Sequence, residues 1–211
     1  MTVTRICLVR HGETDWNAER RLQGQLDIPL NDNGQQQATR LAAALKQAAH
    51  PFAALYSSDL QRAASTAAPI AQQLGLAVSA LPELRERHFG ALQGVTLDQG
   101  PSQQPHAWHG YSQREPAHDL GGGESLLAFS ARVHHALARL AAEHHGQSIL
   151  LVSHGGVLDM AYRLASGQPL TAQRAVPIPN AALNWLGVDA AQWSIIEWAD
   201  QRHLAQTLDE L

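Results

Sequence analysis

Two short apolar segments that each end at a histidine constrain the fold of this chain more than any other feature. Residues 6–9 are all apolar and lead into Arg10 and His11, and residues 148–153 (SILLVS) lead directly into His154. Continuous apolar runs of this length are typical of strands covered on both faces, as in a parallel sheet. Ligands of open α/β sheets gather at the carboxyl ends of such strands. We therefore expect His11 and His154 to converge at one sheet edge.

Segments with strand and helix periodicity alternate along the whole chain. Further strands are expected at 54–57, 77–80, 182–188 and 192–198. The expected helices are one that Asn31 or Asn33 caps and that stops before His50, one over 59–74 capped by Ser58, one over 124–145 and one over 155–164. This order predicts βαβ units and a mostly parallel sheet, an α/β fold.

Residues 90–123 interrupt the alternation, because their periodicity fades and Gly, Pro, Gln and His become frequent. Long irregular stretches in compact proteins are often lids over a functional site. We expect a flap of loops and short helices there, within a single domain over residues 1–211, a length that one domain can hold.

Composition excludes several classes of function. The chain carries a net charge of −4 and no block of Lys and Arg, so a nucleic acid or an acidic membrane surface is not the expected partner. Its one cysteine, Cys7, lies inside an apolar run and is expected in the core. The start lacks a signal-peptide pattern and no apolar run could span a bilayer, so a cytoplasmic protein is expected.

The residues at the expected sheet edge suit an anion. Arg62 lies near the start of the helix that follows the strand at 54–57, so it can point to the same edge as Arg10 and His11. Gly155 and the glycine after it open a helix, whose free N–H groups favour negative charge. Arginine binds two phosphate oxygens at once, and a phosphoryl group is therefore the expected occupant.

The motifs resemble, in order, those of the histidine phosphatase superfamily, in the branch of phosphoglycerate mutases and small bacterial phosphatases. The matching residues are Arg10-His11-Gly12-Glu13-Thr14 with Asn17, Gln23-Gly24, residues 27–30, Ser57-Ser58-Asp59-Leu60-Gln61-Arg62-Ala63, residues 84–90, residues 122–125 and Ser153-His154-Gly155-Gly156. The resemblance runs nearly end to end and implies a three-layer α/β/α sandwich of the phosphoglycerate mutase type.

The resemblance also implies the role of each site residue. His11 would be the nucleophile that forms a phosphohistidine, with a backbone carbonyl holding its other ring nitrogen. Arg10 and Arg62 should lower the pKa of His11 and, with His154, would bind the phosphoryl oxygens. The expected phosphate-binding residues are Arg10, Asn17, Gln23, Gly24, Arg62, His154 and Gly155.

Glu86 would be the general acid that protonates the leaving alkoxide and then activates water. Arg85 and Arg87 are expected to point away from it. Glu13 is expected to be a solvated loop carboxylate, with help in the acid step as the alternative. Glu124, at a helix start, is expected to offset the helix dipole or support the flap.

In the flap, Trp108 and Tyr111 could contact substrate. His106, His109 and His118 lack the ligand spacing of a zinc site, so no metal is expected.

Three functions are weighed. The first is a metal-independent phosphomonoesterase for a small phosphorylated metabolite, which needs no cofactor. The second is a phosphoglycerate mutase primed by 2,3-bisphosphoglycerate; the flap favours hydrolysis over it, since residues 90–122 contain Arg114 as their one Arg and no Lys. The third, a catalytically silent phospho-ligand-binding module, is disfavoured because no motif residue is missing. The sequence leaves open whether the protein forms a homodimer, and it does not identify the leaving group of the substrate.

Overall fold

The computed structural model describes residues 3–190 and 192–205, and within them a six-stranded sheet has the order β3-β2-β4-β1-β5-β6. The strands are β1 (Thr4–Arg10), β2 (Ala54–Ser57), β3 (Val78–Ala80), β4 (Ser148–Ser153), β5 (Leu183–Asp189) and β6 (Gln192–Asp200). Strands β1 to β4 run parallel, whereas β5 pairs antiparallel with both β1 and β6. The mostly parallel sheet expected from the sequence is confirmed.

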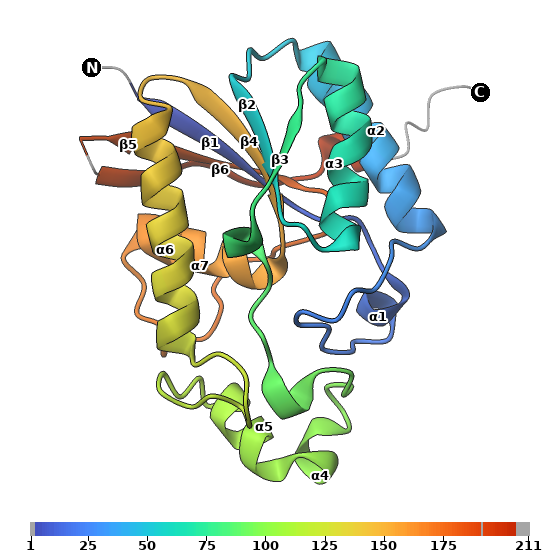
Figure 1. Ribbon diagram of the computed structural model, residues 1–211, viewed down its shortest axis with the longest axis vertical. Coiled ribbons are helices and arrows are strands. Elements are labelled where there is room, and N and C mark those ends of the chain that lie inside the picture. Colours follow the sequence, from blue (N-terminus) through green and yellow to red (C-terminus); the bar gives the residue numbers. More distant parts are fainter. Residues whose placement is uncertain (1–2, 191, 206–211) are drawn as a thin grey trace.

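Helices cover both faces of this sheet (Figure 1). Helices α2 (Asp32–Ala48) and α3 (Gln61–Leu74) pack on one face through an apolar core that includes Leu41, Ala63 and Ile70. Helices α6 (Leu126–Glu143) and α7 (Gly155–Ser166) pack on the other face, where Phe129 and Val133 belong to a second core. The fold is therefore the three-layer α/β/α sandwich of the phosphoglycerate mutase type.

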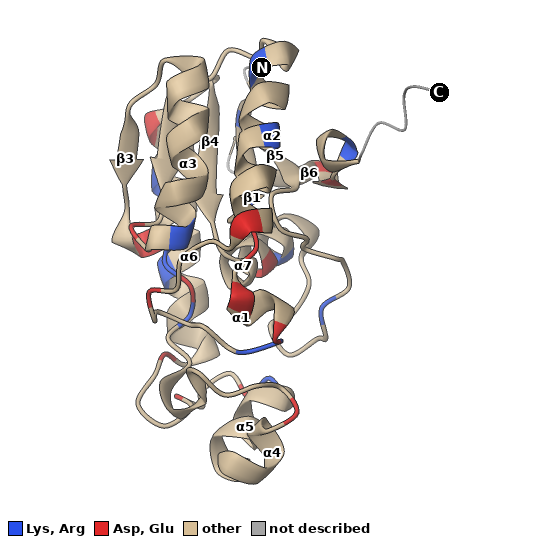
Figure 2. Ribbon diagram, turned by 90° about the vertical axis from the view of Figure 1, so that its right-hand side faces the viewer, with Lys and Arg blue, Asp and Glu red and all other residues tan. Residues whose placement is uncertain are grey.

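The pairing of β1 with β4 brings the two histidine segments together. Arg10 lies opposite Ser153 in this parallel register, and the His11 N–H donates to the Ser153 carbonyl at 2.9 Å. His11 and His154 therefore leave the sheet side by side. In Figure 2 the central strands are free of charged residues over most of their length, and charged residues gather below their lower ends.

The flap, residues 90–123, lies below the sheet in Figure 1. It contains α4 (Gly100–Gln103), α5 (Pro105–Ser112) and a 3-10 turn at Gly90–Leu92, around a small core of Leu92, Ala107 and Leu120. Short helices and turns were expected there. The remaining helical pieces are α1 (Asp15–Ala18) and 3-10 turns at Pro82–Leu84 and Arg202–Leu204.

The cap predicted for α3 is wrong. This helix begins at Gln61 after the N-cap residue Leu60, and no side chain caps it. The Ser58 hydroxyl instead accepts from the N–H of Leu60, before the first helical residue, and lies 2.8 Å from Nε2 of His154. The alternative cap for α2 is settled as Asn31, whose side chain accepts from the Gly34 N–H.

No helix within residues 3–190 and 192–205 is both long enough and apolar enough to cross a bilayer.

Candidate active site

His11 is held in one tautomer by its own loop. Its Nδ1 lies 2.7 Å from the Gly12 carbonyl oxygen, which can only accept, so Nδ1 carries the proton and Nε2 keeps a lone pair. Gly12 is required here because a Cβ would overlap the Gly34 carbonyl. Burial, and then the charges of Arg62 and Arg10, lower the pKa of His11 well below its usual value. The imidazole is therefore neutral at pH 7, as expected from the sequence, and burial is the larger cause.

Two arginines, the half-buried Arg10 and the buried Arg62, flank His11, and each is anchored by backbone carbonyls. Arg10, at the end of β1, donates from Nη1 to the Ile178 carbonyl. Arg62, in the first turn of α3, donates from Nη1 and Nη2 to the carbonyls of Leu26 and Gly24. Burial lowers the pKa of both guanidinium groups to about 10, so both stay charged at pH 7. The loop carbonyls thus fix two cations beside the nucleophile.

His154 lies next to His11, with 5.2 Å between the ring centroids. It is fully buried, and burial together with Arg62 lowers its pKa well below the usual value. It does not line the pocket surface itself. Its Nε2 is paired with Ser58, which leaves Nδ1 for another partner.

Three buried nitrogens around His11 find no hydrogen-bond partner within the part of the chain that the structure describes: Arg10 Nε, Arg62 Nε and His154 Nδ1. Buried polar groups are almost always hydrogen-bonded, so such a cluster indicates a missing partner. The two guanidinium nitrogens can only donate. The partner that satisfies them is a buried acceptor with negative charge, such as a phosphoryl group.

The other expected phosphate-binding residues also lie at this pocket. Asn17 accepts at Oδ1 from the Thr14 N–H, which leaves its Nδ2 to donate to a ligand. Gln23, Gly24 and Gly155 line the same cavity. Gly24, with φ of 55°, is the residue whose carbonyl binds Arg62.

The carboxylate of Glu86 occupies the N-terminus of α7, which the sequence suggested would be free to bind an anionic ligand. Its Oε2 accepts from the Gly156 N–H at 2.9 Å and its Oε1 from the Arg87 N–H at 2.8 Å. A Cβ at Gly156 would overlap this carboxylate. The second N–H of the helix, which the sequence assigned to an anionic ligand, is therefore used by Glu86.

The loop that carries Glu86 is held from α6. Arg132 donates to the carbonyls of Glu83, Arg85 and Glu86 and forms a two-bond ion pair with Glu124. Glu124 also accepts from the His88 N–H and does not line the pocket, which agrees with the structural role expected for it.

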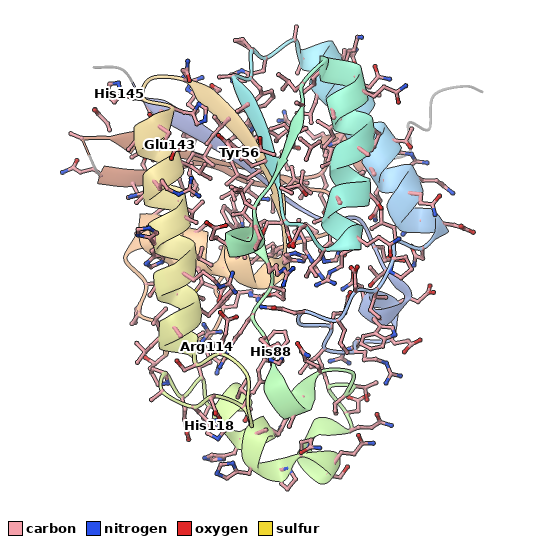
Figure 3. The ribbon with its side chains drawn as sticks, in the orientation of Figure 1. Tyr56, His88, Arg114, His118, Glu143 and His145 are labelled. Carbon is pink, nitrogen blue, oxygen red and sulfur yellow. The ribbon has the colours of Figure 1, made fainter. Side chains whose placement is uncertain are left out.

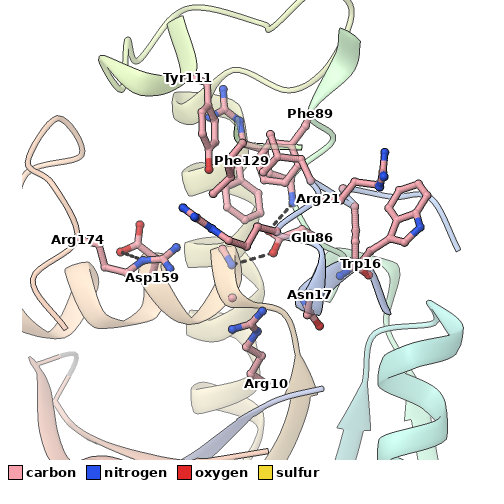
Figure 4. A pocket seen from close by; sticks show the side chains of 18 of the residues that line it. Arg10, Trp16, Asn17, Arg21, Glu86, Phe89, Tyr111, Phe129, Asp159 and Arg174 are labelled. Carbon is pink, nitrogen blue, oxygen red and sulfur yellow. Dashed lines mark hydrogen bonds and ion pairs between the residues drawn. The ribbon is translucent and has the colours of Figure 1, made fainter. Parts of the chain in front are cut away.

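Of these residues, Arg10, His11, Asn17, Arg62 and Glu86 line one cavity of about 440 Å³, within the range of small-molecule sites. Among the described residues, its lining includes two acidic residues, Glu86 and Asp159, and seven arginines: Arg10, Arg20, Arg21, Arg62, Arg87, Arg114 and Arg174. Figure 4 shows Arg10 pointing up into this space, Tyr111 pointing down from the flap and Arg174 entering from the side. A cavity so rich in guanidinium groups favours ligands with more than one negative charge.

The direction predicted for Arg87 is wrong. Its side chain is buried, lines the pocket, and donates to the carbonyls of Glu124 and His118. Arg85 does point elsewhere, to a two-bond ion pair with Asp59. Of the two aromatic residues proposed to contact substrate, Tyr111 lines the cavity and Trp108 does not.

Glu13 lies outside the pocket lining and supports a helix start. Its carboxylate accepts from the side chain of Asn31, the N-cap of α2, at 2.9 Å. Glu13 is therefore half-buried and paired with a capping residue, whereas a solvated loop carboxylate was expected.

Sequence reasoning missed several residues at this pocket. Asn180 donates to the His11 carbonyl at 2.7 Å, and Arg20, Arg21 and Arg174 line the cavity. None of them lies in a motif at a strand end, and only their tertiary positions identify them.

A metal site is not formed by the described residues, where no three His, Cys, Asp or Glu side chains gather closely enough to hold an ion. In the flap, His106 and His118 contact each other, whereas His109 pairs with Glu115.

Comparison with known proteins agrees with the geometry. The chain is 42% identical over 96% of its length to phosphoglycerate mutase-like protein 4 of Arabidopsis thaliana, of which it covers 87%. It is 39% identical, over the same share, to a metal-independent phosphoserine phosphatase of that plant, of which it covers 84%. Among solved structures, Bacillus stearothermophilus YhfR matches with a TM-score of 0.86 and 31% identity, over 96% of this chain and all of YhfR. The family model described as histidine phosphatase superfamily (branch 1) matches residues 6–201, and the chain belongs to this superfamily.

Proposed function

We propose that this protein is a metal-independent phosphomonoesterase that hydrolyses a small phosphorylated metabolite through a phosphohistidine at His11. The observation that carries the proposal is the neutral His11 surrounded by three buried nitrogens that lack partners in the described chain. A phosphoryl group supplies the acceptor oxygens that these nitrogens need and places phosphorus beside Nε2.

In the first step, the Nε2 lone pair of His11 attacks phosphorus, and the bond between phosphorus and the leaving oxygen breaks. The Gly12 carbonyl stabilises the proton on Nδ1 as the ring becomes cationic. Arg10, Arg62 and His154 donate to the equatorial oxygens, where charge is spread in the transition state.

Glu86 supplies the proton that the leaving alkoxide takes up. Its carboxyl group lies on the same cavity as His11, at the start of α7, and two backbone N–H groups fix its position. In the second step it removes a proton from water, which attacks the phosphohistidine and releases inorganic phosphate. His11 and Glu86 are then restored.

The relatives support a substrate that carries a carboxylate as well as a phosphate. The name of one Arabidopsis relative specifies phosphoserine, and the arginines of this cavity can neutralise a second anion. We therefore place O-phosphoserine and 3-phosphoglycerate first among the substrates to be tested.

A phosphoglycerate mutase is the second candidate, because the cavity is more basic than the flap sequence suggests. The flap contributes Arg114, but Arg20, Arg21, Arg87 and Arg174 reach the same cavity from outside it. The low count of basic residues in the flap therefore no longer argues for water as the acceptor. Hydrolysis is preferred because the phosphatase relative is named as such and is similar over nearly the whole chain.

The deciding experiment measures phosphate release with chelator present from O-phosphoserine, 3-phosphoglycerate, sugar phosphates and p-nitrophenyl phosphate. Isomerisation of 3-phosphoglycerate, primed with 2,3-bisphosphoglycerate, is measured in parallel. Chelator-resistant release that His11→Ala abolishes supports the phosphatase. Isomerisation that is much faster than phosphate release makes the protein a mutase, and binding of these compounds without either reaction makes it a phospho-ligand-binding module.

A further inference from the structure

Ser58 is a buried polar residue that takes no part in the proposed steps of phosphoryl transfer. It is the first residue after β2, the strand on which Figure 3 labels Tyr56. Its backbone N–H donates to the Val152 carbonyl of β4 at 2.9 Å, and the residue has no exposed surface. The sheet therefore holds the Ser58 hydroxyl close to the residues that follow β4.

The Ser58 oxygen takes part in two hydrogen bonds. It accepts from the Leu60 N–H at 3.3 Å and lies 2.8 Å from Nε2 of His154. Within the described residues, its side chain makes no other hydrogen bond. A hydroxyl has one proton to donate and two lone pairs, one of which the Leu60 N–H uses. Nε2 of His154 is then the acceptor that is available to the hydroxyl proton.

The two nitrogens of His154 have different roles because the ring is neutral. Burial, and then the charge of Arg62, lower the pKa of His154 well below its usual value. A neutral imidazole has one N–H and one lone pair. If Nε2 carried the proton, this N–H and that of Leu60 would both donate to Ser58, and the buried hydroxyl proton would lack an acceptor, which is costly. A proton on Nδ1 satisfies all three groups.

The same tautomer gives a role to the other ring nitrogen. Nδ1 of His154 is buried and has no partner in the described part of the chain, and its ring lies beside that of His11, with 5.2 Å between the centroids. With a proton, Nδ1 is a donor like Arg10 Nε and Arg62 Nε, and the three suit one anionic acceptor. With a lone pair, it would instead face the oxygens of that anion as a second acceptor.

We propose that Ser58 is a positioning residue, whose hydroxyl donates to Nε2 of His154 and so keeps the imidazole proton on Nδ1. The use of this proton, a hydrogen bond to a phosphoryl oxygen, rests on the proposed phosphatase function. Ser58 does not touch the substrate and acts through His154. Because Arg62 follows in the first turn of α3, residues 58–62 fix two of the donors to the phosphoryl group.

The tautomer is measured directly by ¹⁵N NMR of the histidine rings, since a ring nitrogen with a proton and one with a lone pair have different chemical shifts. The labelled protein is studied without ligand at neutral pH, and the signals that disappear in His154→Gln identify those of His154. We expect the proton on Nδ1 in the wild type and a mixture with the Nε2–H form in Ser58→Ala. A wild type with the proton on Nε2, or an unchanged tautomer in Ser58→Ala, overturns the proposal.

Steady-state rates test what the proton does. Ser58→Ala should lower kcat/KM by about 10- to 100-fold, as for the weakening of one buried hydrogen bond to a charged group. All substrates share the phosphoryl group, so the factor should be the same for p-nitrophenyl phosphate and O-phosphoserine. Ser130→Ala, which removes a buried hydroxyl of α6 outside the cavity lining, is the matched control and should keep the wild-type rates. Wild-type rates in Ser58→Ala, or a loss confined to one leaving group, contradict the role.

Failure of the phosphatase proposal looks different. The wild type then releases no phosphate even from p-nitrophenyl phosphate, whereas the tautomer of His154 is still measured in the free protein. Calorimetric binding of inorganic phosphate then takes the place of the rates. Its affinity should fall by the same factor in Ser58→Ala and stay unchanged in Ser130→Ala, and equal affinity in wild type and Ser58→Ala overturns the role of the Nδ1 proton.

Discussion

The floor and the roof of the cavity both present arginines, but they are built in different ways. The floor consists of Arg10, His11, Arg62 and His154, which follow buried strands or begin the helix after one, and their backbone is fixed by the sheet. The roof consists of Arg87, Tyr111, Arg114 and Arg174, which come from loops and the flap, and two of them, Arg114 and Arg174, pair with the buried carboxylate of Asp159.

This difference separates the chemistry from the choice of substrate. Rigid strand ends can hold a nucleophile and its phosphate ligands in place, which phosphoryl transfer requires. Loops can vary without changing the sheet, so leaving-group selectivity is expected to lie there. Changes in the roof should therefore alter which substrate is hydrolysed, whereas changes in the floor should abolish hydrolysis of every substrate.

The largest effect is expected at the floor. His11→Ala removes the attacking nitrogen and should lower kcat by about 10⁴-fold or more with every substrate. Phosphate release under saturating substrate measures it. His135→Ala, an exposed histidine on α6, is the matched control and should behave as wild type. Residual turnover within 100-fold of wild type in His11→Ala would show that another group attacks phosphorus.

Glu86→Gln should have an effect that depends on the leaving group. An alkoxide needs a proton, so hydrolysis of O-phosphoserine should fall by about 10²- to 10⁴-fold. A p-nitrophenolate leaves without one, so its burst rate should fall far less, while slow hydrolysis of the phosphoenzyme limits steady-state turnover with both substrates. Burst and steady-state rates for both substrates make the comparison, with Glu83→Gln on the same loop as control. Equal losses of the burst rate with both leaving groups would remove Glu86 from the role of acid.

Arg132→Gln tests whether the acid depends on its support from α6. The variant loses bonds to three carbonyls of the loop from Glu83 to Glu86, so Glu86 should be misplaced. We expect a loss of about 10- to 100-fold with alkyl phosphates and less with p-nitrophenyl phosphate. Arg139→Gln, two turns further along the same face of α6 and partly exposed, is the control, since its side chain bonds no backbone carbonyl of this loop among the described residues. A loss independent of the leaving group would mean a general structural role.

The smallest effect concerns stability against pH. Both histidines of the floor have a pKa well below 6.5 in the folded protein, mainly through burial. The unfolded chain therefore binds more protons below pH 6.5, and the free energy of unfolding falls as the pH falls. Between pH 7.5 and 5.5 each histidine should contribute a loss of about 1 kcal/mol.

Urea unfolding at the two pH values measures this loss. In His11→Gln, the loss of unfolding free energy between the two pH values should be smaller than in the wild type by about half of the combined contribution of the two histidines. A dependence on pH that is unchanged in His11→Gln would contradict a depressed pKa at this site.

The sequence predicted the sheet and the floor because both depend on local signals. Apolar runs marked β1 and β4, and the polar residues directly after them lie where parallel strands end. No comparable pattern in the sequence marked the residues of the roof. Arg174 lies in a loop without periodicity, and its position depends on Asp159 from another element. Arg87 was placed wrongly because its partners, the carbonyls of His118 and Glu124, lie more than 30 residues away.

The central claim, that His11 receives the phosphoryl group, has one direct measurement. Glu86→Gln is mixed with p-nitrophenyl phosphate, a substrate that needs no acid but whose phosphoenzyme should hydrolyse slowly without Glu86. The reaction is quenched in base, where phosphohistidine is stable, and peptides are analysed by mass spectrometry. A burst of p-nitrophenol matched by phosphate on His11 is the predicted result. A burst with phosphate on another residue, or turnover with neither burst nor phosphorylated peptide, would contradict it.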